Sequence, residues 1–245
     1  MFLKFKIILF TLIFSLGLES ILFFGSWWLF SIGILLLLAI FQGKKLGGRW
    51  IFAVLPSVFS IFSAGLLYLV TLPGERQAFI ALSSLMYYLS LLGIYRLKKA
   101  PTDQTARGMV VAGSFTALFF AFSASYGFYL NYLVPVYVLM LGYFAISLLI
   151  SYGTLIFFKK GEGNIWFFSF VLSFLVAQIV WTLNFWPFGY LTTGVIALIL
   201  YYVLWEIIRG HISLVLSKKR LVGHLVGVSV LIGIVLLTSK WTPTF

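Results

Sequence analysis

Residues 164–210 have the sequence NIWFFSFVLSFLVAQIVWTLNFWPFGYLTTGVIALILYYVLWEIIRG, which contains no charged side chain before Glu206. About 20 apolar residues in a helix cross the ~30 Å hydrocarbon core of a bilayer. The stretch is long enough for two such helices, 164–186 and 188–209, with a turn beside Gly189 between them. It therefore predicts a membrane-spanning helical hairpin.

The composition of the whole chain extends this prediction to all 245 residues. Hydrophobic residues make up 62% of the chain and charged residues only 9%, whereas soluble domains carry about 25% charged residues. Aromatic residues reach 20%, which excludes disorder because disordered chains are poor in aromatic residues. The composition is that of a polytopic membrane protein.

Apolar runs between polar breaks predict an all-α transmembrane bundle that forms a single integral membrane domain, 1–245. The first two runs leave an alternative open, because 7–43 could hold one interfacial element and one span, which would give eight spans. The nine predicted spans are 7–24, 27–43, 50–71, 77–95, 108–128, 132–158, 164–186, 188–209 and 221–241.

The basic residues predict the orientation of these spans, because cytoplasmic loops collect Lys and Arg. With nine spans and the N-terminus inside, only Arg76 and Lys240 of the 17 basic residues fall outside. We therefore expect the N-terminus inside and the C-terminus outside. The net charge of +12 is then an orientation signal, and it gives no support to nucleic-acid binding.

Small residues recur every four positions on two predicted helices, where they would allow close approach of helix backbones in lipid. We interpret them as packing positions inside the bundle, and dimerisation is the alternative. They are Gly113, Ala117, Ala121 and Ser125 on the fifth span and Gly223 and Gly227 on the ninth. Pro56 and Pro135 fall inside predicted spans, so we expect kinks there.

Charged side chains deep in a membrane are costly, and they are candidate functional groups for that reason. Glu206 and His224 fall at similar depth on the eighth and ninth spans, and Arg209 follows Glu206 by three positions on the same helix face. We predict a polar cluster of these three residues. It would be either a proton-responsive or ligand-binding site, since His titrates near neutral pH, or an ion pair that anchors the helix end. The ion pair is the favoured interpretation.

Three amides offer a second candidate site. Gln178 lies well inside the seventh span, and Asn131 and Asn184 lie near outer turns. The three could line a substrate cavity, although an interhelical hydrogen bond would account for Gln178 equally well.

The sequence gives little support to catalysis. It contains no cysteine, which excludes thiolate metal sites and disulfides. Its two histidines lack the spacing of a zinc protease motif, and we place His211 in a loop. Among the acids, Asp103 and Glu162 are expected in inner loops, and Glu75 beside Arg76. We predict no catalytic residues, no metal and no cofactor.

The segment Asn184-Phe-Trp-Pro-Phe-Gly-Tyr-Leu-Thr-Thr-Gly194, followed by an aromatic apolar helix, a basic loop and Lys240-Trp241, carries a resemblance. Over residues 165–241 the chain is similar to uncharacterised multi-span proteins predicted from genomes of uncultivated bacteria. The resemblance implies a bacterial cytoplasmic membrane as the location, and it implies no activity.

The sequence thus favours a non-enzymatic integral membrane protein, a scaffold or accessory subunit of a membrane complex. Its expected partners are the lipid bilayer and other membrane proteins or a second copy of itself. The alternative is a small-solute, lipid or ion transporter with a site between helices. A membrane enzyme would need converging catalytic groups, which only the region of Glu206 and His224 could supply.

Overall fold

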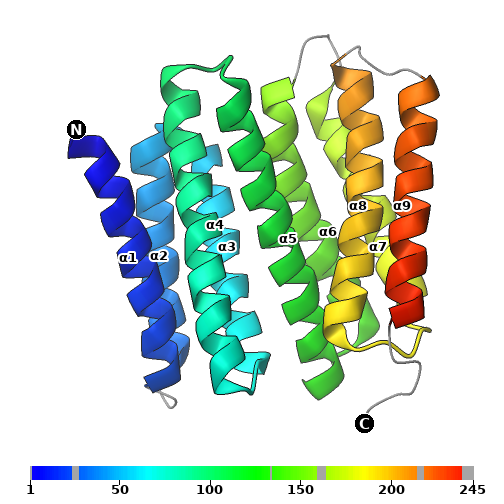
Figure 1. The fold of residues 1–245 in the computed structure, drawn as a ribbon, viewed down its shortest axis with the longest axis horizontal. Helices are drawn as coiled ribbons and strands as arrows, with labels where there is room; N and C mark the ends of the chain where they lie inside the picture. The colour runs from blue at the N-terminus through cyan, green and yellow to red at the C-terminus, as the bar shows by residue number, and fades with distance from the viewer. Residues whose placement is uncertain (1, 24–27, 133, 159–163, 214–217, 239–245) are drawn as a thin grey trace. The chain divides into compact units, whose positions relative to one another are not determined.

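The computed structural model describes residues 2–23, 28–132, 134–158, 164–213 and 218–238, and these residues form nine α-helices, one short 3-10 helix and no strands (Figure 1). The all-α fold class is therefore confirmed. The helices are α1 (Phe2–Phe23), α2 (Trp28–Gly47), α3 (Ile51–Leu69), α4 (Pro73–Lys99), α5 (Gln104–Tyr132), α6 (Val136–Leu155), η2 (Ile156–Phe158), α7 (Ile165–Leu183), α8 (Tyr190–Ile212) and α9 (Lys218–Thr238).

Eight of the nine helices are long and apolar enough to cross a membrane, so the chain has the character of a multi-pass membrane protein. The first pair contributes two of the eight, α1 and α2. In α9 the described side chains form a shorter apolar helix, Val222–Thr238, so the ninth span stays a prediction. The side of the membrane on which each terminus lies stays a prediction.

The chain divides into two compact units, 1–124 and 125–245, and the division falls within α5. In the N-terminal unit, α2 and α3 form the most closely packed pair, and α1 and α4 pack against each other and against this pair. Three aromatic side chains fill the centre. Phe14 stacks on Tyr87 with ring centroids 4.1 Å apart, and Phe59 lies 5.5 Å from the same tyrosine ring.

Glycines set the spacing of α2 and α3. A Cβ added at Gly43 would lie 2.5 Å from the Ala53 Cα, and one at Gly47 would lie 2.3 Å from the Phe52 Cβ. These distances are far below van der Waals contact, so the two backbones approach as closely as they do because no side chain stands between them. The close packing of α2 on α3 therefore depends on glycine at positions 43 and 47.

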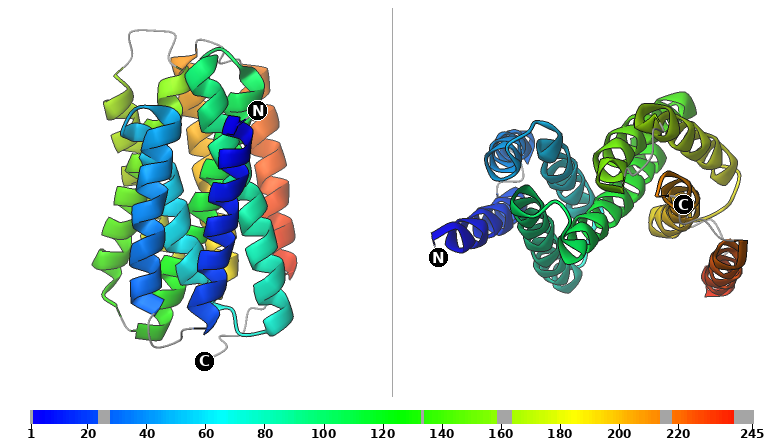
Figure 2. Two further views of the ribbon diagram at one scale, coloured as in Figure 1. Left: turned by 90° about the vertical axis from the view of Figure 1, so that its left-hand side faces the viewer. Right: turned by 90° about the horizontal axis from the view of Figure 1, so that it is seen from above.

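In the C-terminal unit, α6 and α7 form the close pair, α8 packs against α7, and α9 packs against α8. Viewed from above, α9 lies at the edge of its unit, beyond α8 (Figure 2). The buried Tyr201 of α8 and Ser151 of α6 share a hydrogen bond of 2.9 Å. The N-terminal unit has a similar buried pair, because Tyr87 of α4 donates to Gln42 of α2 at 2.7 Å.

The two prolines behave differently from each other. Pro56 lies inside α3, where we expected it. Pro135 was wrongly placed within a span, because it is the N-cap of α6 and has an extended ψ of 140°. The α5 helix also continues through Gly127 to Tyr132, so the turn between α5 and α6 comes a few residues later than predicted. Proline is tolerated at a helix start because its missing N–H has no partner there in any case.

Candidate functional site

One face of α8 carries a row of polar side chains. Tyr202, Glu206, Arg209 and Ser213 follow one another at spacings of three or four residues, which places them in a row along the helix. The neighbouring face of α8 points inward, and Tyr201 and Trp205 are buried there. The helical repeat therefore separates an apolar core face from a polar row directly beside it.

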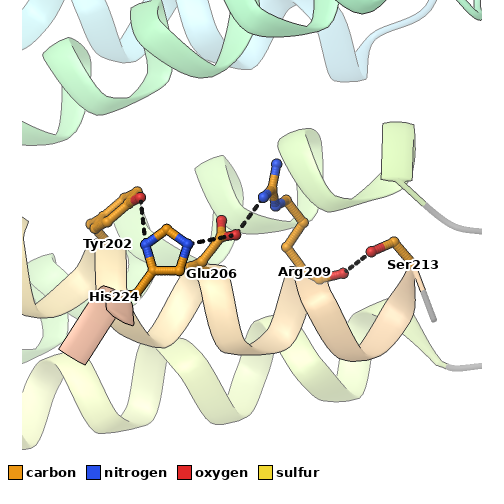
Figure 3. Close-up of polar contacts among 5 residues, drawn as sticks. All are labelled: Tyr202, Glu206, Arg209, Ser213 and His224. Atoms are coloured by element: carbon orange, nitrogen blue, oxygen red, sulfur yellow. Dashed lines mark hydrogen bonds and ion pairs between the residues drawn. The ribbon is translucent and has the colours of Figure 1, made fainter. Parts of the chain in front are cut away.

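His224 of α9 meets this polar row (Figure 3). Its ring lies between Tyr202 and Glu206, with Nδ1 3.5 Å from the Tyr202 hydroxyl and Nε2 3.7 Å from Glu206 Oε1. Glu206 lies six residues before the end of α8 and His224 six residues after the start of α9, about 9 Å along each helix. The two antiparallel helices thus bring the side chains to the same depth. We call Tyr202, Glu206, Arg209 and His224 the α8–α9 cluster.

Arg209 neutralises the carboxylate of Glu206. Its guanidinium forms an ion pair with Glu206 Oε1, and it lies over two aromatic rings, 5.2 Å from the centroid of Trp205 and 5.5 Å from that of Phe158. Both distances are within the range of cation–π attraction. Glu206 has only 9% of its surface exposed, so the arginine supplies the charge that a nearly buried carboxylate needs.

The aromatic support continues into α6. The Trp205 indole N–H donates to the Thr154 hydroxyl at 3.3 Å, and the Phe158 ring contacts Trp205 edge-on at 5.7 Å. Arg209 also holds the end of α8, since its carbonyl accepts from the Ser213 hydroxyl. Contacts from α6, η2 and α8 therefore hold Arg209 in place. Among the described contacts of the cluster, His224 is the residue that α9 contributes.

The geometry is that of an ion pair bordered by a histidine. At 3.7 Å the histidine–carboxylate distance is too long for a hydrogen bond, so its attraction depends on a protonated imidazole. The ring still links the two helices through its edge-on contact with Tyr202. Among the described residues, no three His, Cys, Asp or Glu side chains gather as metal ligands would.

The three predicted cavity amides lie on or at the ends of different helices or helix turns, and the cavity stays a prediction. Gln178 is exposed on α7. Asn131 donates to the Gly127 carbonyl of its own helix at 2.7 Å. Asn184 is the C-cap of α7, and its backbone N–H bonds back to the helix. Each amide thus has a local setting, and no hydrogen bond between them occurs in the described part of the chain.

The predicted packing residues have two different settings. Gly113 lies against α4, where an added Cβ would be 2.6 Å from the Ser90 Cβ. Ala117 and Ala121 on the same helix are fully buried, and Ser125 is partly exposed. Gly223 and Gly227 differ, because both are exposed and a Cβ at either would meet nothing within 4 Å.

The remaining polar residues lie near helix ends. Arg76 donates to the Val70 carbonyl at 2.7 Å. Glu19 accepts from Gln77 at 3.3 Å, which joins α1 to α4. His211 lies in the last turn of α8 against the Phe168 ring, so our placement of it in a loop is wrong. Glu162 is outside the described residues.

Asp103 closes the turn between α4 and α5. One carboxylate oxygen accepts from the Ala106 N–H at 3.2 Å, and the other pairs with Arg96 at 2.7 Å. The Ala106 N–H, followed by Arg96, holds the pKa of this carboxyl below its ordinary value.

Sequence reasoning missed two polar contacts. Tyr202 joins the α8–α9 cluster, and its place four residues before Glu206 was the available signal. The Gln42–Tyr87 bond carried no local signal, because its partners are 45 residues apart.

The family described as "Protein of unknown function (DUF5656)" matches residues 41–238. The chain belongs to this family. The DUF5656 match ends at Thr238, the last residue of α9, so it includes both helices of the α8–α9 cluster. No curated protein and no solved structure matches the chain.

Proposed function

We propose that this DUF5656 protein is a non-enzymatic accessory or scaffold subunit of a membrane complex, and that it binds its partner along α9. The observation that carries the proposal is the open backbone edge of α9 at Gly223 and Gly227. Both glycines are exposed, and an added Cβ at either position would meet no neighbour within 4 Å.

An open glycine edge favours another helix as the occupant. Lipid chains cover exposed apolar side chains such as Val226 and Val230 as well as protein does, so those residues alone select no partner. Two glycines one turn apart let a second helix approach the backbone closely, which gains van der Waals contact and ordered packing. The family match includes α9 in full, which supports a shared role for this helix.

Charge favours a different protein over a second copy as the partner. The sequence of α9 begins Lys218-Lys219-Arg220. Two copies of this chain in one membrane have the same orientation, so a contact between their α9 helices would bring six cations together at one end. Like charges so close repel each other. We therefore expect a partner helix that has small residues opposite Gly223 and Gly227 and acidic residues opposite Lys218–Arg220.

The chain offers a matched pair of variants for the test. Gly227→Ile fills the proposed contact, and Gly233→Ile adds the same side chain on a different face of α9, where a Cβ also meets nothing within 4 Å. Native mass spectrometry after gentle extraction should show a stoichiometric partner with the unaltered chain and with Gly233→Ile, and lose it with Gly227→Ile.

Crosslinking completes this test. Because the chain has no cysteine, a single cysteine at position 223 should form a crosslink to one partner polypeptide, while a cysteine at position 233 should not. A homodimer mass, an unaccompanied chain, or equal loss of the partner in both isoleucine variants would overturn the proposal.

A transporter is the second candidate, and buried hydroxyls without a hydrogen-bond partner favour it. Among the described residues they include Ser83 and Ser123 in the N-terminal unit and Ser147 and Ser169 in the C-terminal unit. Unpaired buried hydroxyls are uncommon, and water commonly satisfies them.

Cysteine accessibility separates the two candidates. Ser147→Cys and Ser169→Cys would report on the interior of the C-terminal unit against a cysteine-free background. A solute pathway requires both thiols to react with a small water-soluble reagent in intact membranes. An accessory subunit with a closed interior leaves them unreactive, while a cysteine at the exposed His211 position, in the last turn of α8, reacts as the positive control.

A further inference from the structure

The turn between α2 and α3 carries a cluster of cations contributed by two parts of the N-terminal unit. Lys44 lies in the last turn of α2, and Arg49 lies in the turn itself, which continues to Trp50. Lys98 reaches the same turn from the end of α4. Its Nζ lies 3.4 Å from the position that a Cβ on Gly48 would take.

Local geometry builds this turn. Gly48 has a φ of +79°, which only glycine adopts at low cost, and its N–H closes the end of α2 by donating to the Lys44 carbonyl at 2.8 Å. The Lys44 ammonium lies 3.8 Å from the centre of the Trp50 ring. The chain therefore folds back over a bare glycine, and Lys98 occupies the space that a side chain on Gly48 would fill.

No carboxylate in the described part of the N-terminal unit neutralises these cations. Its acids are Glu19, Glu75 and Asp103. Asp103 is paired with Arg96. Glu75 is in the first turn of α4 and Lys98 in the last, about 35 Å apart along the helix. Glu19 lies at the same far end, where it accepts from Gln77.

The helix dipoles balance only part of this charge. Lys44 lies at the negative C-terminal end of α2, and Lys98 lies in the last turn of α4 beside Gly48, which closes that same end of α2. Each helix end carries only about half of an elementary charge. The two helix ends therefore cannot balance Lys44, Lys98 and Arg49 together, and the cluster keeps a net positive charge.

The surroundings indicate where a counter-charge comes from. Trp50 is 65% exposed and Phe41 is 55% exposed, and tryptophan at a helix end is typical of the headgroup layer. Anionic lipids attract basic residues near the membrane surface by about 1 kcal/mol for each Lys or Arg. Phosphate oxygens also match both kinds of cation here, because Arg presents a planar fork of donors and Lys a mobile ammonium charge.

We propose that the α2–α3 turn, together with Lys98, binds the phosphate of an anionic phospholipid headgroup through Lys44, Arg49 and Lys98. The acyl chains of that lipid would lie along the exposed aromatic residues beside the turn. The proposal rests on the membrane character of the chain, and it is independent of any partner of α9.

The test uses the full-length chain and a charge-matched control. Lys44→Gln/Lys98→Gln removes two cations from the proposed site. Lys45→Gln/Lys99→Gln removes two cations from the same helix ends. The ammonium groups of these two lysines lie 4.9 Å and 5.0 Å from the rings of Phe41 and Tyr95, and that of Lys44 lies 3.8 Å from the ring of Trp50, so both double variants remove a lysine–aromatic contact. Lys44→Arg/Lys98→Arg keeps the charge and checks that substitution at these positions is tolerated.

Native mass spectrometry would measure retention of phosphatidylglycerol and phosphatidylcholine from mixed micelles. The unaltered chain should retain one phosphatidylglycerol in preference to phosphatidylcholine. Lys44→Gln/Lys98→Gln should weaken that preference on the order of tenfold to thirtyfold. The control and the arginine variant should change it less than about threefold, a small part of the change expected from two surface cations.

Three outcomes would overturn the proposal. Equal retention of the two lipids would show no preference for an anionic headgroup. Equal losses in the glutamine variant and its control would indicate a diffuse charge effect. Displacement of the lipid by inorganic phosphate at millimolar concentration would identify a soluble phosphate compound as the ligand.

Discussion

The α2–α3 and α8–α9 pairs each consist of two apolar helices that follow one another along the chain, but different contacts hold them together. In α2–α3, a carbon added at Gly43 would overlap the Ala53 backbone, and one added at Gly47 would overlap the Phe52 side chain. In α9, a carbon added at Gly223 or Gly227 would meet no neighbour within 4 Å, and polar contacts between α8 and α9 run from His224 to Glu206 and Tyr202.

This difference shows that a pattern of small residues four positions apart does not by itself predict which neighbour packs against the helix. Gly223 and Gly227 have the spacing of a helix-packing motif, yet both are exposed. Gly43 and Gly47 have the same spacing of four residues, and they are the ones packed against a neighbouring helix. The pattern marks a helix edge that can be approached closely, and only the tertiary structure tells which neighbour uses it.

The largest expected effect comes from filling the close contact. Gly43→Ala should lower the free energy of unfolding by about 2 kcal/mol, because its Cβ would meet the backbone of Ala53, which cannot move as a side chain can. Gly227→Ala should leave stability unchanged or raise it by up to about 1 kcal/mol, since alanine is the better helix former. Thermal unfolding in detergent measures both, and a loss in Gly227→Ala as large as that in Gly43→Ala would refute the contrast.

A smaller effect is expected from the polar contacts of the two regions. Tyr87→Phe leaves the buried Gln42 carbonyl oxygen without its 2.7 Å hydrogen bond, at a cost of about 1–2 kcal/mol. Tyr202→Phe removes the long 3.5 Å contact with His224, so we expect less than about 0.5 kcal/mol. Unfolding of the two variants side by side would check this order, and the reverse order would contradict the structure.

The third prediction concerns local opening. Glu206→Gln removes the carboxylate that Arg209 pairs with and His224 faces. We expect faster hydrogen exchange in α9, with a change in global stability of about 1 kcal/mol, since α9 packs on one edge of its unit. Glu75→Gln, at the start of α4, is the control. Unchanged exchange in α9 would mean that apolar contacts alone hold it.

The smallest effect is expected at Asp103 and depends on pH. Its folded-state pKa lies below the ordinary 3.8, so its contribution is present above that value and is lost as the pH falls through the lowered pKa. Asp103→Asn should therefore lower the Tm slightly near neutral pH, and the two melting curves should converge in acid. A difference that grows as the pH falls would contradict the stated cause.

Much of the fold could be predicted from the sequence, because a helix that crosses a bilayer must be long and apolar. Spans need length and apolar side chains, so the predicted ranges agree with the helices to within a few residues at most ends. The errors lie where local chemistry decides. Pro135 starts a helix that we had extended through it, and His211 continues a helix that we had ended before it.

The polar sites were harder to predict from the sequence than the helices, and the reason is physical. Glu206, Arg209 and His224 could be brought together in prediction because helix spacing and depth along two consecutive spans define their positions. Lys98 lies over Gly48 because α4 ends beside the α2–α3 turn, which depends on the packing of three helices. Periodicity within one helix carries no information about such a contact.

The lengths of α4 and α5 have a consequence for the water-facing side of the protein. With 27 and 29 residues they measure about 40 Å and 43 Å, against a hydrocarbon core of about 30 Å. The hairpin that they form therefore extends roughly one to two helical turns beyond the hydrocarbon core. The turn at Pro101 and Asp103 closes this hairpin. The extra length carries the charged end of the hairpin, with Arg96, Lys98 and Lys99 in the last turn of α4, out of the hydrocarbon core, a reach that the 19-residue helices lack.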